Sequence, residues 1–62
     1  MFVKCDICKY DSGDFDSCEQ IAMKVNADGG SMALVKEPGT DKPRGWEIQC
    51  PNGHSGDAIH LD

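Results

Sequence analysis

The segments Cys5-Asp-Ile-Cys8 (CDIC) and Cys50-Pro-Asn-Gly-His54 (CPNGH) decide how this chain folds. CDIC spaces two thiols as in the tight turns that hold a tetrahedral metal ion. In CPNGH, Pro51 fixes the backbone angle φ after the cysteine, and Gly53 permits a turn that brings the histidine back toward that cysteine. Three thiols and one imidazole are a typical ligand set for structural zinc. The predicted ligands of one zinc ion are Cys5, Cys8, Cys50 and His54.

Two other residues remain alternative ligands. Cys18 could supply a fourth thiolate, but a long acidic loop separates it from CDIC, and free cysteine also serves as a small buried apolar residue. His60 could pair with His54, but it stands between Ile59 and Leu61 in an alternating segment, which favours a solvent-facing strand position. Zinc is preferred to iron because rubredoxin-like iron sites use four thiolates.

The composition indicates a single small domain, residues 1–62, that has too little apolar material to fold without help. Only 11 of its 62 residues are Val, Ile, Leu or Phe, below the ~20 % that is typical of folded chains with appreciable net charge. The chain has 11 acidic and 6 basic residues, and its formal charge is −5. A domain of this size has little room for a substrate pocket, so we expect no enzymatic activity. The acidity also argues against nucleic acid as a partner.

The N-terminal residues and the cysteines indicate a cytoplasmic protein. No apolar run reaches the roughly 18 residues of a membrane span, and MFVKCDICK lacks the apolar region of a secretory signal. In a reducing compartment, closely spaced cysteines are metal ligands or redox groups more often than disulfides. In a secreted protein the four cysteines would instead form disulfides with one of three connectivities.

The segment from 18 to 25 fits two structures. Cys18, Ile21, Ala22 and Val25 have helical spacing, and Ser17 with Gln20 fits a helix capping box. The alternation of Ile21, Met23 and Val25 fits a strand equally well. Asp28-Gly29 is a strong signal for a two-residue hairpin turn, which would pair Val25 with Met32 and Met23 with Leu34. We therefore predict a hairpin in this segment.

The remaining segments predict further extended structure. EPGTDKPRG, from Glu37 to Gly45, has two prolines and two glycines and predicts a loop, as does the polar stretch from Tyr10 to Asp16. Residues 46–49 alternate as a third strand, 1–4 form an extended lead into CDIC, and 58–61 could add a last short strand. The predicted fold is a small metal-stabilised all-β domain with a three-stranded antiparallel sheet.

The two metal-binding turns with strands between them resemble the zinc-ribbon group of small domains. The resemblance implies that CDIC and CPNGH are the two zinc knuckles and that antiparallel strands join them. It rests on architecture and ligand pattern rather than on one family within the group. CDIC departs from the common form because it lacks a proline after Cys5 and a glycine after Cys8, and the second knuckle has its histidine one position later.

A site closed by four protein ligands has no position for substrate, so we expect the zinc ion to be structural. The first function expected is therefore that of a protein–protein binding or adaptor module. Its acidic residues, which include Asp11, Asp14, Asp16 and Glu19, suit a basic partner. The alternative is a nucleic-acid-binding zinc ribbon, in which phosphate contacts and base stacking combine. The residues for that function are Lys36, Lys42, Arg44 and Trp46.

Overall fold

Two small antiparallel sheets and one α-helix make up the structure, a computed structural model that describes residues 1–62. Strand β1 pairs with β4, and β2 pairs with β3, so the predicted three-stranded sheet and the all-β class are wrong, although the domain is small and mostly β. The elements are β1 (Val3–Cys5), α1 (Cys18–Ala27), β2 (Ser31–Lys36), β3 (Pro43–Gln49), the 3-10 helix η1 (Gly56–Ala58) and β4 (Ile59–Leu61).

The β1–β4 sheet joins the two ends of the chain. Its register places Val3 opposite Leu61 and Cys5 opposite Ile59, which confirms the short strands expected near both termini. Backbone hydrogen bonds between Phe2 and Asp62 in both directions extend this pairing beyond the strands. The segments that carry the two cysteine turns are therefore fixed next to each other.

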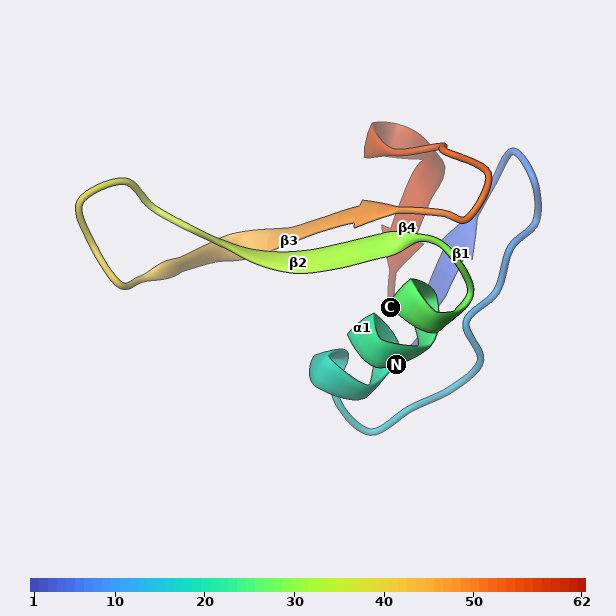
Figure 1. Cartoon of the computed structure of the whole chain (residues 1–62), viewed down its shortest axis with the longest axis horizontal. Helices are drawn as coiled ribbons and strands as arrows, with labels where there is room; N and C mark the ends of the chain where they lie inside the picture. Colours follow the sequence, from blue (N-terminus) through green and yellow to red (C-terminus); the bar gives the residue numbers. More distant parts are fainter.

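Strands β2 and β3 form a hairpin arm that projects away from the rest of the molecule (Figure 1). The molecule measures 35 × 23 × 19 Å along its principal axes, and the arm accounts for its elongated outline. The predicted loop from Glu37 to Gly45 is too long, because β3 begins at Pro43 and a register shift between Val35 and Lys36 absorbs the mismatch in strand length. The predicted third strand, 46–49, lies within β3.

The predicted hairpin in residues 18–34 is wrong, because residues 18–27 form helix α1. Ser17 caps its N-terminus and accepts a hydrogen bond from the Gln20 amide at 3.3 Å. The buried stripe of α1 contains Ile21 and Val25, whereas Met23 is 74 % exposed. Amphipathic packing thus favours the helix over the strand pattern.

Asp28-Gly29 ends the helix instead of turning a hairpin. Gly29 has φ of +97°, and the amide of Gly30 donates to the carbonyl of Val25 at 2.9 Å, as expected for a glycine-terminated helix. Glycine at positive φ occurs both in hairpin turns and at helix C-termini. The Asp-Gly signal therefore marks a change of chain direction but does not distinguish these two structures. Met32 and Leu34, the predicted partners of α1 residues, instead pair with Ile48 and Trp46 of β3.

The hydrophobic core lies where α1 packs against β2 and against the β1–β4 sheet. Its buried members are Val3, Ile21, Val25 and Met32, and partly buried residues including Trp46, Ile48 and Ile59 surround them. Other large apolar residues do not belong to this core, since Ile7 is 62 % exposed and Leu34 is 44 % exposed. The core is therefore as small as the composition indicated.

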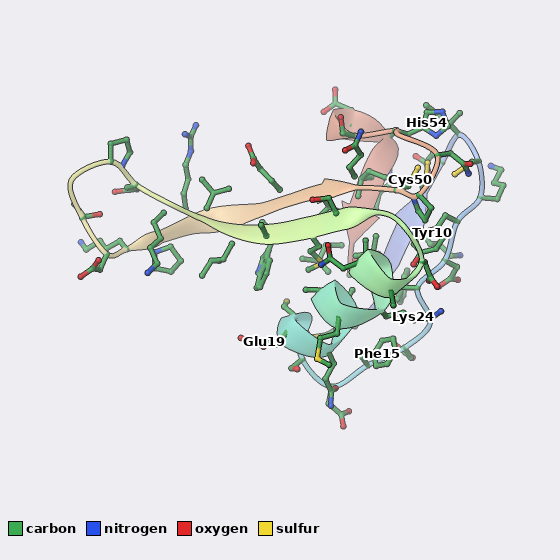
Figure 2. The ribbon with its side chains drawn as sticks, in the orientation of Figure 1. Tyr10, Phe15, Glu19, Lys24, Cys50 and His54 are labelled. Atoms are coloured by element: carbon green, nitrogen blue, oxygen red, sulfur yellow. The ribbon has the colours of Figure 1, made fainter.

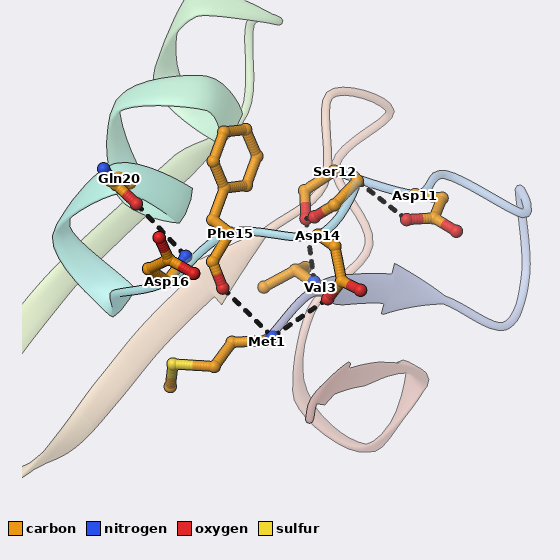
Figure 3. Close-up of polar contacts among 9 residues, drawn as sticks. Met1, Val3, Asp11, Ser12, Asp14, Phe15, Asp16 and Gln20 are labelled. Carbon is orange, nitrogen blue, oxygen red and sulfur yellow. Dashed lines mark hydrogen bonds and ion pairs between the residues drawn. The ribbon is translucent and has the colours of Figure 1, made fainter.

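The loop between CDIC and α1 is held against β1 by polar contacts (Figure 3). The amide of Val3 donates to the hydroxyl of Ser12 at 2.9 Å, and Ser12 is buried. The amino group of Met1 lies 2.9 Å from the Asp14 carboxylate and donates to the carbonyl of Phe15 at 3.1 Å. Residues 10–16 therefore form a loop, as predicted, and hydrogen bonds hold this loop against β1.

Helix α1 has ten residues, and the structure contains no helix with the length and apolar character needed to span a bilayer.

Candidate metal centre

Four side chains from opposite ends of the chain converge at the base of the hairpin arm. The ligand atoms of Cys5, Cys8, Cys50 and His54 all lie within 4.8 Å of one another. Cys5 and Cys50 are buried, while Cys8 and His54 are half-buried. Figure 2 shows Cys50 and His54 side by side near the turn that follows β3. These are the four residues predicted from the sequence, and they are positioned to bind a metal ion.

The first cysteine turn begins at the end of β1 and is closed by its own backbone. The Lys9 amide donates to the Cys5 carbonyl at 3.0 Å, and the Cys5 amide donates to the Tyr10 carbonyl at 2.9 Å. Lys9 adopts φ of +63°, the only positive φ of a non-glycine residue in the chain. Glycine adopts such a φ most readily, so a non-glycine residue here is unusual and the turn closes in spite of its side chain.

The second turn returns the histidine to the cysteine, as its sequence predicted. The Cys50 amide donates to the His54 carbonyl at 2.9 Å, and the Gly53 amide donates to the Cys50 carbonyl at 2.9 Å. Gly53 has φ of +90°. The His54 amide lies 3.3 Å from Sγ of Cys50, so the backbone donates a hydrogen bond to the sulfur. Such donors stabilise a thiolate and orient it toward a metal.

The separations of the ligand atoms fit a tetrahedral zinc site. Sγ of Cys8 lies 3.5 Å from Sγ of Cys50, and Nδ1 of His54 lies 3.4 Å from Sγ of Cys50 and 3.6 Å from Sγ of Cys5. With bonds of about 2.3 Å to sulfur and about 2.0 Å to nitrogen, tetrahedral geometry places the ligand atoms roughly 3.5–3.8 Å apart. These three separations are therefore close to those around a tetrahedral zinc ion, and all four ligand atoms lie within 4.8 Å of one another.

The surroundings of the four residues affect the thiols differently. Hydrogen bonds from the side chains of Asn52 and His54 lower the pKa of Cys8 to about 6. Burial raises the pKa of Cys5. The fold thus favours the thiolate form of Cys8, whereas a bound cation would offset the cost of burying a charge on Cys5. No sequence signal indicated a separate role for Asn52, although it lies within CPNGH.

The alternative ligands lie elsewhere. Cys18 is at the start of α1 and packs, partly buried, against the hydrophobic core. His60 is exposed on β4, and its Nε2 lies 2.6 Å from the Asp6 carboxylate. Neither side chain belongs to the group of ligand atoms.

Tyr10 and Asp28 form a second link that sequence reasoning missed. The Tyr10 hydroxyl donates to the Asp28 carboxylate at 2.6 Å, and Nζ of Lys24 lies 2.9 Å from the other carboxylate oxygen. Tyr10 directly follows the first cysteine turn, and Asp28 follows α1. The hydrogen bond thus ties the metal centre to the end of the helix. No sequence motif marks such a contact between separate elements.

The residues named for nucleic-acid binding all lie on the hairpin arm. Lys36, Lys42 and Arg44 are exposed near its tip, together with the acidic Glu37 and Asp41. Trp46 is half-buried and packs against the core, so its ring is only partly available for stacking.

Comparisons of the chain with models of known protein families, with curated proteins and with solved structures find no match.

Proposed function

We propose that this protein is a structural-zinc-binding module of zinc-ribbon type whose folded surface binds another protein. The observation that carries the proposal is the convergence of three cysteines and one histidine to within 4.8 Å. Four protein ligands complete a tetrahedral shell, which leaves no position for water or substrate. The zinc ion is therefore structural, and the module has no catalytic role.

The small core supports a structural role for the ion. Only four residues form the buried cluster of the core, and ten-residue α1 supplies two of them. Binding of structural zinc contributes about 10–16 kcal/mol in small metal-dependent domains, enough to decide whether such a chain folds. Ligation through thiolates also suits a reducing compartment, in agreement with the expected location in the cytoplasm.

The test is to remove and restore the metal. Native mass spectrometry of the purified chain is expected to show one zinc ion per molecule. Excess chelator is expected to abolish the far-UV circular dichroism of α1 and the sheets, and added zinc to restore it. A chain that keeps a folded spectrum with no metal bound contradicts the proposal.

Nucleic acid remains the second candidate partner because the arm carries exposed Lys36, Lys42 and Arg44. Three acidic residues on the same arm balance them, and the rest of the molecule carries the whole net charge of −5. We therefore favour a protein partner. Binding of single-stranded DNA or RNA that weakens steeply with salt, and that requires these three residues, is the result that would reverse this preference.

A further inference from the structure

A groove of about 620 Å³ lies between β3 and the segment from Ser55 to Leu61, and Ser31 of β2 also lines it. Trp46 and Ile48 of β3 form one wall, and Ile59 and Leu61 of β4 form the other. An isolated bridge between Gln49 and Ser55 marks its end nearest the metal centre. Four of the nine lining residues are thus apolar, the others include Ser31, Glu47 and Gln49, and the second cysteine turn bounds the groove at one end.

The strand that borders the groove is unpaired on this side. Apart from the bridge between Gln49 and Ser55, β3 pairs only with β2, and β4 pairs only with β1, so each strand has a largely free edge. Alternate residues of an edge strand direct their amide and carbonyl groups outward, where a further strand can pair with them. Such an edge beside apolar pockets is the arrangement by which protein domains bind extended peptides through strand addition.

The charge of the groove indicates which peptide sequences could bind there. Glu47 is the only charged residue among the groove's lining residues, and no basic side chain lines it. Asp57 follows in η1, next to the lining residue Gly56. An added strand places alternate side chains on opposite faces. Apolar side chains on one face would contact Trp46 and Leu61, while basic side chains on the other would lie near Glu47.

We propose that this groove binds an extended segment of a partner protein in which apolar residues alternate with lysine or arginine, by addition of that segment to the free edge of β3. The inference rests on the proposed function, because the zinc-bound turn fixes the end of the groove. A second copy of this chain is a less suitable occupant, since both copies carry a charge of −5 and would bring like-charged Glu47 residues together.

The experiment uses the zinc-loaded chain and a capped eight-residue peptide of alternating lysine and valine. Trp46 is the only tryptophan, so its fluorescence reports directly on the groove. The peptide is expected to shift the emission in a saturable manner. A glutamate–valine peptide is expected to bind at least tenfold more weakly. A lysine–valine peptide whose alternate backbone nitrogens are methylated is also expected to bind at least tenfold more weakly, because its methylated nitrogens cannot donate hydrogen bonds to β3.

Two matched pairs of variants locate the binding. Glu47→Lys and Glu37→Lys change the net charge equally, but only Glu47 lines the groove. Leu61→Lys and Met23→Lys both replace an exposed large apolar residue, 36 % and 74 % exposed, and only Leu61 lines the groove. We expect the first member of each pair to weaken binding about tenfold or more and the second to leave it within about twofold.

The outcomes separate this inference from the proposed function. If the zinc-loaded chain is folded by circular dichroism but binds no peptide, or if all variants and the methylated peptide bind alike, the groove is not the binding site and the zinc module stands. If the zinc-loaded chain dimerises through β3 in sedimentation experiments, the occupant is a second copy and the inference is wrong. If the chain does not fold with zinc, the proposed function fails first.

Discussion

Sγ of Cys8 lies 3.5 Å from Sγ of Cys50, although 42 residues separate the two cysteines in the chain. Each cysteine turn supplies only two of the four ligand atoms, so neither can complete a tetrahedral site alone. The pairing of β1 with β4 is the contact that brings the two turns together. The site and the fold must therefore form together.

We predict that Cys8→Ser abolishes tight zinc binding and that Cys18→Ser does not. Cys8 faces the other ligand atoms, whereas Cys18 packs against the core. The measurement is the zinc content of each variant by native mass spectrometry after dialysis. His54→Ala and His60→Ala provide the corresponding pair for the imidazole, and only His54→Ala is expected to lose zinc. Retention of zinc by Cys8→Ser together with its loss from Cys18→Ser would reassign the ligands.

We predict that Gly30→Ala destabilises the zinc-loaded chain by about 3 kcal/mol, through overpacking. A Cβ atom at Gly30 would lie 2.5 Å from the Gln49 carbonyl oxygen and 2.9 Å from Cγ1 of Val25. Gly39→Ala is the comparison: its Cβ atom meets nothing within 4 Å, so only the strain of alanine at φ of +77° lowers its stability, by about 1 kcal/mol. Urea unfolding at a fixed excess of zinc measures both, and equal losses would show that close packing at Gly30 is unimportant.

We predict that Met23→Lys changes the free energy of unfolding by less than about 0.5 kcal/mol, as is usual for surface substitutions. Helix α1 exposes 74 % of Met23 to solvent. Val25→Lys is expected to prevent folding, because it buries an unpaired charge in the core. If the hairpin interpretation of this segment were correct, both substitutions would fall on the same apolar face and both would be damaging.

We predict that Asp28→Asn lowers stability by an amount that is constant from about pH 8 to about pH 5.5. Hydrogen bonds from Lys24 and then Tyr10 lower the pKa of Asp28 below its usual value. A carboxyl group with a lowered folded-state pKa stabilises the fold above its unfolded-state pKa of about 3.9, and the stabilisation is lost only as the pH falls through the lower value.

The check is the difference in urea midpoint between wild type and Asp28→Asn at several pH values, with Asp41→Asn as an exposed control. Any loss of the fold between about pH 6.5 and 5 is expected in all three proteins, because protons then compete with zinc for the thiolates. A difference between wild type and Asp28→Asn that disappears at a pH above 5 where wild type is still folded would show that the Asp28 contacts do not act in this way.

The ligand positions could be predicted from sequence because the turn geometry is local. CDIC and CPNGH each fix the separation of their two ligands within a few residues, and only the approach of the two turns depends on the rest of the chain. The assignment of Cys18 and His60 to other surroundings likewise followed from their neighbours.

The helix could not be predicted because its signals were ambiguous. Ile21 and Val25 fit both periods, and Gly29 ends a helix as readily as it turns a hairpin. The decision depends on a nonlocal fact, namely that β3 supplies Ile48 and Trp46 as partners for Met32 and Leu34. The hydrogen bond from Tyr10 to Asp28 is nonlocal in the same sense.

The hairpin arm is attached to the metal centre only at its base, where β3 ends at Gln49 and Cys50 follows. A metal ion bound by the four residues would therefore hold the residues near 31 and 49 without restraining those near 36 and 43. Opening of the distal end breaks few buried contacts, whereas opening of the base requires loss of the metal. In hydrogen–deuterium exchange, amides of the arm should exchange faster with distance from Cys50. Saturating zinc should slow exchange most at the base of the arm and least at its tip.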